Sequence, residues 1–550
     1  MNHFAILNLM KKSMKKVIKR VGIILVVLIL FIGAAGIYVN SIIPKPIGSP
    51  PELQEELFKR PDHPTVIEAK YIYKSASELA TMIRRREVLS KDVVMEFLSN
   101  IKNNNYKYNA LIWLREEEAI HDAELADERV LKGDTLNVPL LGVPITIKEM
   151  FWVKGSPSTL NAKMFGFIAP DDAVVVKQLK NAGAVILGTT NVSYLLGDYQ
   201  TQGEVYPTGN NPYDTSRTPG GSTGGGAAAL AAGFSTLELG SDLGGSIRIP
   251  AAFCGLYGLK PSLGSVNITQ GTSPDTVTKF SRMALASAGP LARSVEDLQL
   301  MWEVLKNTPQ DKRFQHPIEW KKAPDKSLAE YKIAWIDEWK HGDQIVRVSN
   351  DVKEKMKLLL DSLSVNGVKV SKRAPDTYDE MKKLFLGTFA SMMGEGQPWL
   401  LRKFISMDFK KLEDGSAAFQ SFYDAMNDNS DSKWNELMST RESLVRQWDS
   451  FFKEEDFFIC PITYGVAIKK CPQGSMLNGD DGEMPYMSYF SYGYIFNATG
   501  HPSLVIPMGL NKDGLPVGLQ IVSSYYNEDG LLKFAKLISP FTSHFIFPTK

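Results

Sequence analysis

Apolar segments of two kinds alternate along the first 190 residues. Ser75-Ala76-Ser77-Glu78 has the pattern of a helix capping box and precedes apolar residues at helical spacing. A second such helix is expected to begin at Ser90. Leu140–Ile147 and Ala184–Gly188 are uninterrupted apolar runs of strand length, as in buried strands. Strands that alternate with helices predict an α/β fold, in which helices cover both faces of a sheet.

The same patterns predict further elements before and after these. The expected segments are a short strand at Asn109–Ile112, a charged helix at Arg115–Lys132 ended by Gly133, and helices at Asp172–Ala182 and Gly226–Ala232. From Thr308 to Ile459 the chain is more polar and less regular, with a strand at Tyr331–Ile336 and a helix at Val352–Leu363. Phe385–Met407 is rich in Phe, Met and Leu, a composition that fills a core more often than it lines a pocket.

The N-terminus has the pattern of a membrane segment. Val21–Val39 contains 19 residues without a charge and follows the basic stretch Lys11–Arg20. It is interpreted as a transmembrane signal-anchor, with a cleaved signal peptide and a secreted body as the alternative. The positive-inside rule places the basic tail, residues 1–20, in the cytosol and the body outside it, in a periplasm or lumen. Residues 40–70 are proline-rich and are expected to form a stiff linker to a single body, residues 71–550.

Charge and cysteine content exclude several classes of protein. The formal net charge is +1, but residues 1–51 hold seven basic residues and no acid, so the remainder carries −6. That balance argues against a nucleic-acid partner. Three cysteines make no disulfide framework, although Cys460 and Cys471 could pair, and Cys254 lies in an apolar run. No Cys and His residues have metal-ligand spacing, so no metal or cofactor is expected.

Two glycine-rich loops between Arg217 and Pro261 each present a serine. Ser222 lies in Gly-Gly-Ser-Thr-Gly-Gly, and Ser246 lies in Asp-Leu-Gly-Gly-Ser-Ile-Arg. Glycine lets the backbone approach a ligand closely, and successive N–H groups before a serine can hold an oxyanion. Either loop alone has the composition of a flexible loop. A Walker A phosphate loop fits poorly, because no Lys-Ser/Thr pair follows the glycines.

These two loops resemble the signature of the amidase signature family, serine hydrolases that include the fatty-acid amide hydrolases. The resemblance extends over about residues 75–548, from the serine loops to the C-terminal Phe496–Val522. Thr223 replaces the second serine of the family's GGSSGG loop and keeps a hydroxyl. The resemblance implies an amidase-signature α/β fold, with a central mixed sheet covered by helices on both faces, in addition to the N-terminal membrane helix.

The resemblance also implies a Ser-Ser-Lys site for amide hydrolysis. Ser246 would be the nucleophile, Ser222 the bridging serine and Lys148 the base. The oxyanion hole would be formed by the N–H groups of Leu243, Gly244, Gly245 and Ser246. Asp242 and Arg248 are expected to support the structure of the site and not to act as catalysts.

A lysine at the end of an apolar strand is desolvated, which favours its neutral form and supports a role as base. The ordinary lysine pKa of about 10.4 would have to fall to roughly 7–8. Glu149, where the family has Asp, must then point away from Lys148, or its charge would keep the lysine protonated.

Several alternatives remain open at this stage. Gly220–Gly224 formally fits the G-x-S-x-G elbow of an α/β-hydrolase, but no strand precedes it. His501 would then be a candidate base, although a lone histidine is more often structural. The chain could also be a membrane-tethered binding protein on an inactive amidase scaffold. Within the family, it could resemble a glutamyl-tRNA amidotransferase subunit that works with partner subunits.

The expected substrate is a lipid-like N-acyl amide. A body tethered near a bilayer would meet such lipids, and the Phe385–Met407 segment offers apolar surface for an acyl chain. Membrane-bound fatty-acid amide hydrolases, which the chain resembles, point to the same class. The alternative is a general amidase for short-chain or aryl amides. Patterns in one sequence give no oligomeric state.

Overall fold

The structure is a computed structural model that describes residues 52–66, 68–269, 282, 284–310, 318–341 and 344–548. Contacts divide the chain into Met1–Pro46 and Ile47–Lys550, and everything described below lies in the second unit. The predicted anchor, Val21–Val39, and the basic tail lie outside the described residues. Among the helices that are described, none is both long and apolar enough to cross a bilayer.

A sheet of eleven strands forms the centre of this unit. The order across the sheet is β1 (Leu111–Leu114), β5 (Val185–Thr190), β2 (Pro144–Lys148), β6 (Leu237–Asp242), β8 (Ser287–Ala292), β7 (Tyr257–Lys260), β16 (Ser503–Leu510), β17 (Pro516–Val522), β13 (Phe457–Pro461), β9 (Lys332–Trp335) and β12 (Lys369–Lys372). Strands β5, β2 and β6 run parallel, as do β13, β9 and β12, whereas the pairs between these groups are antiparallel. The predicted mixed α/β sheet is confirmed.

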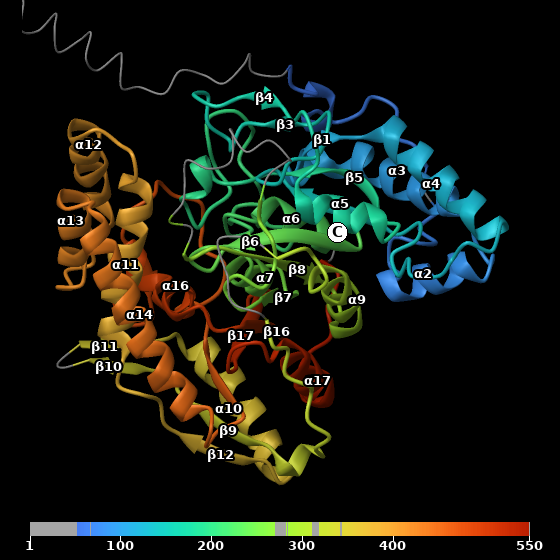
Figure 1. Ribbon diagram of the computed structural model, residues 1–550. Coiled ribbons are helices and arrows are strands. Elements are labelled where there is room, and N and C mark those ends of the chain that lie inside the picture. Colours follow the sequence, from blue (N-terminus) through green and yellow to red (C-terminus); the bar gives the residue numbers. More distant parts are fainter. Residues whose placement is uncertain are drawn as a thin grey trace, which may run out of the picture. The chain divides into compact units, whose positions relative to one another are not determined.

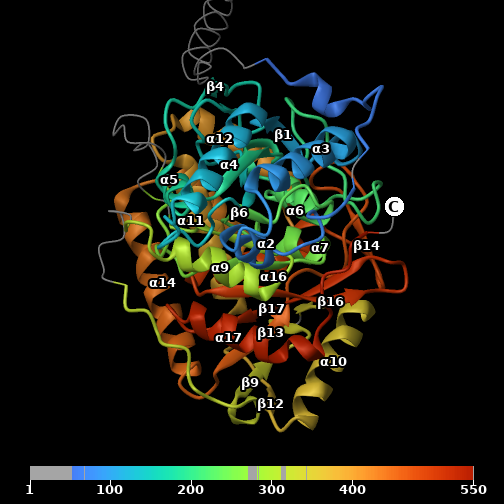
Figure 2. The ribbon, with the colours of Figure 1, turned by 90° about the vertical axis from the view of Figure 1, so that its right-hand side faces the viewer.

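Helices cover the sheet and extend beyond it. Those before β9 are α2 (Ala76–Arg84), α3 (Ser90–Tyr108), α4 (Glu116–Leu131), α5 (Val174–Asn181), α6 (Gly224–Ala231), α7 (Arg248–Phe253) and α9 (Val295–Leu305). The later ones are α10 (Asn350–Val365), α11 (Tyr378–Gly394), α12 (Trp399–Phe409), α13 (Phe419–Asn427), α14 (Asp431–Phe451), α15 (Tyr486–Tyr489), α16 (Ser491–Thr499) and α17 (Glu528–Ile538). Figure 1 shows α11–α14 together on one side of the sheet, in orange, and α2–α5 on the other side, in blue and cyan. The view in Figure 2 shows β17, β13, β9 and β12 following one another toward the lower end of the sheet.

Short elements complete the fold. Two-residue strands β3 (Pro157–Ser158) and β4 (Phe167–Ile168) pair with each other, as do β10 (Trp339–His341) with β11 (Gln344–Val346) and β14 (Leu477–Gly479) with β15 (Gly482–Met484). Single 3₁₀ turns are η1 (Glu55–Phe58), η2 (Tyr194–Leu196), η3 (Leu328–Glu330), η4 (Lys410–Leu412) and η5 (Ser539–Phe541).

Most predicted elements are present, with shifted boundaries where the backbone turns. The capping box at Ser75 is formed, and both α2 and α3 begin where they were expected. The strand predicted from Leu140 begins only at Pro144, because Gly142 takes a φ of +75° and breaks the extended run. The first strand begins at Leu111 rather than Asn109, because Asn109 ends α3 in the left-handed region with a φ of +50°.

The segment after residue 308 is more regular than its polar sequence suggested. Residues 350–451 hold five of the helices, α10–α14. The apolar Phe385–Met407 segment is split, because Gly396 takes a φ of +68° and Pro398 caps α12. Helix α11 is buried core, as predicted, but α12 is not, since Trp399 is 60% exposed and Met407 is 72% exposed.

Candidate active site

Lys148 lies at the carboxyl end of β2, in the middle of the parallel part of the sheet. Its strand is flanked by β5 and β6, whose carboxyl ends meet at the same edge. All five residues of β2 are buried, and the lysine side chain is 0% exposed. Ligand sites of open α/β sheets lie outside such carboxyl ends. The topology therefore places Lys148 where a site is expected.

The Lys148 amine is surrounded by three oxygen atoms. Its Nζ lies 2.7 Å from Ser222 Oγ, 2.9 Å from Ser241 Oγ and 3.3 Å from the Ser241 carbonyl oxygen. A neutral amine has two N–H donors and one lone pair. The two donors match the Ser241 oxygens, and the lone pair is then available to accept the Ser222 hydroxyl proton. The amine therefore has the surroundings of a base directed at Ser222.

Burial lowers the pKa of Lys148 to about 7, although the negative charges of Asp242 and Glu238 act in the opposite direction. A buried ammonium without a directly bonded carboxylate is costly, and the cost is avoided when the group loses its proton. A pKa near the operating pH is what a general base needs. The lysine environment thus has the property that the sequence argument required.

The two serine loops are joined to each other. Thr223 N–H donates to the Ser246 carbonyl at 3.2 Å, and Thr223 Oγ1 donates to the Ser241 carbonyl at 3.3 Å. The Gly221–Ser222 peptide bond is cis. Ser222 is 1% exposed and Ser246 is 7% exposed. Of Lys148, Ser222 and Ser246, the last is thus the side chain most open to a substrate.

The backbone before Ser246 forms a tight loop between β6 and α7. Gly245 has a φ of +110°, which favours glycine, and its N–H donates to Asp242 Oδ1 at 2.8 Å. That bond occupies the Gly245 N–H, one of the four predicted oxyanion donors, and the oxyanion role of these groups stays a prediction. The other three N–H groups, of Leu243, Gly244 and Ser246, donate no hydrogen bond within the described part of the chain.

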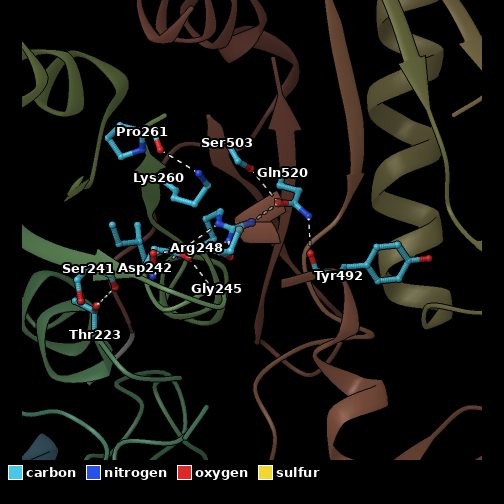
Figure 3. A network of polar contacts seen from close by, with 12 residues as sticks. Thr223, Ser241, Asp242, Gly245, Arg248, Lys260, Pro261, Tyr492, Ser503 and Gln520 are labelled. Carbon is cyan, nitrogen blue, oxygen red and sulfur yellow. Dashed lines mark hydrogen bonds and ion pairs between the residues drawn. The ribbon is translucent and has the colours of Figure 1, made fainter. Parts of the chain in front are cut away.

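A buried ion pair fixes this loop. Arg248 and Asp242 are both 0% exposed and form a two-point pair, with Nε to Oδ2 and Nη2 to Oδ1 each at 2.9 Å. Arg248 lies between Asp242 and Gln520, to which its Nη1 donates at 2.9 Å (Figure 3). Asn497 accepts from Arg248 and donates to Asp242. Burial alone would raise the pKa of the Asp242 carboxyl, but Arg248 outweighs it and holds that pKa well below its usual range. The structural roles expected for Asp242 and Arg248 agree with these contacts.

Glu149 points away from Lys148, as its position next to a neutral lysine required. Its Oε1 accepts from the Thr159 N–H and hydroxyl, each at 2.7 Å, and from Tyr206 Oη at 2.9 Å. Burial raises the pKa of this carboxyl. Glu149 is the first residue after β2, and these hydrogen bonds direct its carboxyl to Thr159 and Tyr206 instead of the lysine amine.

Sequence reasoning missed several residues of this site. Ser241 contacts the lysine amine, yet nothing distinguishes a serine in Leu-Gly-Ser-Asp from any other. Asn497 and Gln520 contact Arg248 but lie more than 200 residues after it in the sequence, so no local sequence pattern predicts them. Phe385 lies beside the loop that precedes Ser246, where a Cβ added at Gly244 would be 3.2 Å from its ring. The Gly-Gly-Ser motif predicted the loop but not the side chains that pack against it.

The histidine alternative does not fit the geometry. His501 is buried and its Nδ1 lies 2.9 Å from Thr499 Oγ1, a structural contact. Residues 214–219 before Ser222 form turns and two isolated bridges, at Asp214 and Arg217, rather than a buried strand, so the α/β-hydrolase interpretation is wrong. Cys254, Cys460 and Cys471 are free thiols. Among the described residues, no three His, Cys, Asp or Glu side chains gather as metal ligands.

Comparison with known proteins gives a family match over most of the chain. The family model described as Amidase matches residues 92–532. One solved structure, titled as a vestigial protein complex revealing the origins of an s-triazine catabolic enzyme, is 25% identical with a TM-score of 0.71. The match covers 86% of this chain and 100% of that one.

Two kinds of relative match the chain about equally well. A glutamyl-tRNA(Gln) amidotransferase subunit of Alkaliphilus metalliredigens is 30% identical over 82% of this chain and 93% of its own length. The human fatty-acid amide hydrolase 2 is 30% identical over 86% of this chain and 90% of its own length. Several other similar relatives carry the amidotransferase name. These relatives support the alternative of an amidotransferase component better than the lipid-amide interpretation.

Proposed function

The chain belongs to the amidase signature family, and from that premise we propose that it cleaves a carboxylic amide through an acyl-enzyme on Ser246. Enzymes of this family are amidases that act on C–N bonds. In the proposal, Ser246 is the nucleophile, Ser222 transfers protons, and Lys148 is the base. The observation that carries it is the buried Lys148 amine, 2.7 Å from Ser222 Oγ.

The proton path follows from these roles. Ser246 Oγ attacks the amide carbon while its proton passes to Ser222, whose own proton passes to Lys148 Nζ. The C–N bond then breaks, and the proton returns through Ser222 to the leaving nitrogen. Water attacks the resulting ester along the same path and releases the acid. Delivering a proton to nitrogen is the hard half of amide cleavage, and a lysine with a pKa of about 7 can both accept and return one.

The negative charge on the attacked oxygen needs donors that are already in place. The N–H groups of Leu243, Gly244 and Ser246 are proposed for this role, because Asp242 occupies that of Gly245. The Asp242–Arg248 pair supports the hole indirectly, since the same carboxylate also accepts from the Ile247 N–H at 3.1 Å. The loop is therefore fixed on both sides of Ser246.

Hydrolysis of a simple primary amide by the purified chain tests the mechanism. Ser246→Ala should lower kcat by several orders of magnitude, because the nucleophile is lost. Ser216→Ala changes an exposed serine in the loop that precedes Ser222 and serves as the control. Full activity in Ser246→Ala would contradict the assignment, as would equal losses in the two variants.

For the substrate, we propose first the alternative that the relatives support better, an amidotransferase-like subunit. Such a chain would release ammonia from a small primary amide and work with partner subunits. The proposal predicts that the chain co-purifies with other proteins from its host. It also predicts that short primary amides are turned over at least as fast as long-chain N-acyl amides.

A lipid-like amide is the second candidate, because specific side chains favour it. The Phe385 ring stacks on Tyr494 with centroids 4.8 Å apart and lies parallel to Phe389 at 6.0 Å. Phe389 leads to Phe409 at 6.0 Å, on α12, which also carries the exposed Trp399 and Met407. Aromatic rings thus run from the loop that precedes Ser246 to the exposed Trp399 and Met407 side chains. The human relative, a fatty-acid amide hydrolase, agrees with this class.

A chain-length series of N-acyl amides separates the two candidates. Each buried methylene should raise kcat/KM roughly fourfold if an acyl channel exists. A flat series would remove the lipid candidate and leave an amidotransferase-like or general amidase. The membrane anchor at Val21–Val39, with the body outside the cytosol, remains part of the lipid proposal.

A further inference from the structure

Glu238 is a buried carboxyl that the mechanism above does not use. It lies on β6, where its register partner on β2 is Thr146, two residues before Lys148. Side chains two residues apart on a strand share a face of the sheet, as do directly paired residues. Glu238 and Lys148 therefore point to the same side of the sheet. The Ser222 loop leads into α6 on this side, because a Cβ added at Gly226 of α6 would lie 2.3 Å from the Glu238 carboxyl.

The carboxyl extends across β2 toward the level of Lys148. Its Oε1 accepts from Thr190 Oγ1 at 2.7 Å, and Thr190 is the residue of β5 that pairs with Lys148. The glutamate side chain thus begins on one neighbour of β2 and ends on the other. Its carboxyl therefore lies on the same side of the sheet as the Lys148 side chain, against α6.

Few other charges act on this pair. Asp242 is the other charged group near Lys148, and it forms an ion pair with Arg248. Around Glu238, β5 contributes the Thr190 hydroxyl, β2 contributes Thr146 and Lys148, and α6 contributes glycine. Glu238 is 0% exposed. Burial raises its pKa to about 7, while the Thr146 and Thr190 hydroxyls and the charge of Lys148 act in the opposite direction. Two interacting groups that titrate in one range share their protons.

We propose that Glu238 is a positioning residue that sets the pH at which Lys148 becomes a free base. The proposal rests on the proposed function, in which Lys148 activates Ser246 through Ser222. A carboxylate on the same side of the sheet as the amine stabilises the ammonium form and raises the pH at which the free base appears. A protonated Glu238 has no such effect. The site therefore carries a second titrating group that regulates the first.

The pH dependence of labelling by a fluorophosphonate tests this without knowledge of the substrate. The labelling rate constant should rise with pH as Lys148 loses its proton. Glu238→Gln keeps the shape of the side chain but removes its charge, so the ammonium loses a stabilising neighbour. The acid limb of the profile should then shift to lower pH by about one unit. An acid limb at the same pH as in the wild type, or a labelling rate constant lowered equally at every pH, would overturn the proposal.

Two further variants make the test specific. Thr190→Val removes the hydroxyl that stabilises the carboxylate, so it should shift the limb in the same direction by a smaller amount. In the Glu238→Gln background, Thr190→Val should cause no further shift. Glu149→Gln neutralises an equally buried carboxyl beside Lys148 that points to Thr159 and Tyr206, and it should leave the limb in place. A shift in Glu149→Gln equal to that in Glu238→Gln would overturn the specific role of Glu238.

The design distinguishes failure of this inference from failure of the proposed function. Thr190→Val alone still tests the inference if Glu238→Gln does not fold. If the wild-type chain does not react, or if Ser246→Ala reacts equally well, the proposed function fails and takes the inference with it. If Ser246 reacts but Glu238→Gln leaves the limb unmoved, the proposed function stands and the inference fails.

Discussion

At the scale of single residues, the site combines one group that is costly to bury with one that is well paired. Lys148 has hydroxyl and carbonyl partners but no carboxylate, whereas Asp242 is held by Arg248 at two points. Burying a lone charge is expensive, but a buried pair with good geometry is costly mainly to break. The two groups should therefore respond to substitution in opposite directions.

Lys148→Met should make the folded chain more stable while it abolishes activity. The pKa of Lys148 is about 7 in the folded chain and about 10.4 in an unfolded one. Between those values the unfolded chain holds more protons, so the free energy of unfolding rises with pH. Replacing the lysine should raise that free energy by about 2–4 kcal/mol at pH 7, after allowance for lost hydrogen bonds. Urea unfolding at pH 7 and at pH 9.5 measures this. A gain as large at pH 9.5 as at pH 7 would contradict the titration argument.

Arg248→Met should destabilise the chain, because it leaves Asp242 buried without its cation. Removing one partner of a buried pair costs about 3–5 kcal/mol. Arg217→Met is a matched control, since the Arg217–Asp214 pair is 22% and 37% exposed and should cost under about 1 kcal/mol. Denaturant midpoints of the two variants give the comparison. Equal losses would show that the buried pair does not fix the Ser246 loop.

At the scale of elements, α6 lies unusually close to the sheet because it begins with three glycines. A Cβ at Gly225 would be 2.4 Å from the Asn191 backbone nitrogen, and one at Gly226 would overlap Glu238. The helix could not approach β2 and β6 with larger residues. This approach places the Ser222 loop, which leads into α6, against the lysine.

Gly226→Ala should destabilise the chain, although alanine is the better helix former. The added methyl group must move α6 or Glu238, an overpacking cost of about 1–3 kcal/mol. Gly394→Ala in α11 is the control, because its Cβ would meet the Asn429 amide and the Arg402 Cδ, which belong to partly exposed side chains. Thermal unfolding of both variants measures the difference. A stabilised Gly226→Ala would contradict the close packing of α6.

At the scale of the whole molecule, features encoded in contiguous segments could be predicted from the sequence, whereas features that depend on contacts between distant segments could not. Strands β2 and β5 and helices α2 and α3 follow from apolar patterns within short windows, whereas β6, the other neighbour of Lys148, was not predicted. The three proposed catalytic residues were assigned through the resemblance to the amidase signature family, whose short motifs a single sequence displays. Glu238 was missed because a single acid in an apolar strand has no pattern. The exposure of α12 was missed because Phe385–Met407 is apolar throughout, and only tertiary packing decides which half is covered.

Removing residues 1–46 should release the chain from membranes without altering its fold. The unit Ile47–Lys550 contains the whole sheet and the site, so its unfolding midpoint should not change. The uncharged Val21–Val39 is long enough to span a bilayer, and its loss should move the protein from the membrane fraction to the supernatant. Fractionation of cells that express either form checks this. A full-length chain found in the supernatant would contradict the prediction that Val21–Val39 anchors it in a membrane.

The central claim, that Ser246 is a nucleophile activated through Ser222 by Lys148, is tested most directly by locating a covalent adduct. The purified chain is treated with a fluorophosphonate, and the modified residue is identified by peptide mass spectrometry. The account predicts one adduct, on Ser246, that is absent in Ser246→Ala and forms more slowly in Ser222→Ala and Lys148→Met. An adduct on Ser222, or adduct formation on Ser246 that is indifferent to Lys148, would contradict it.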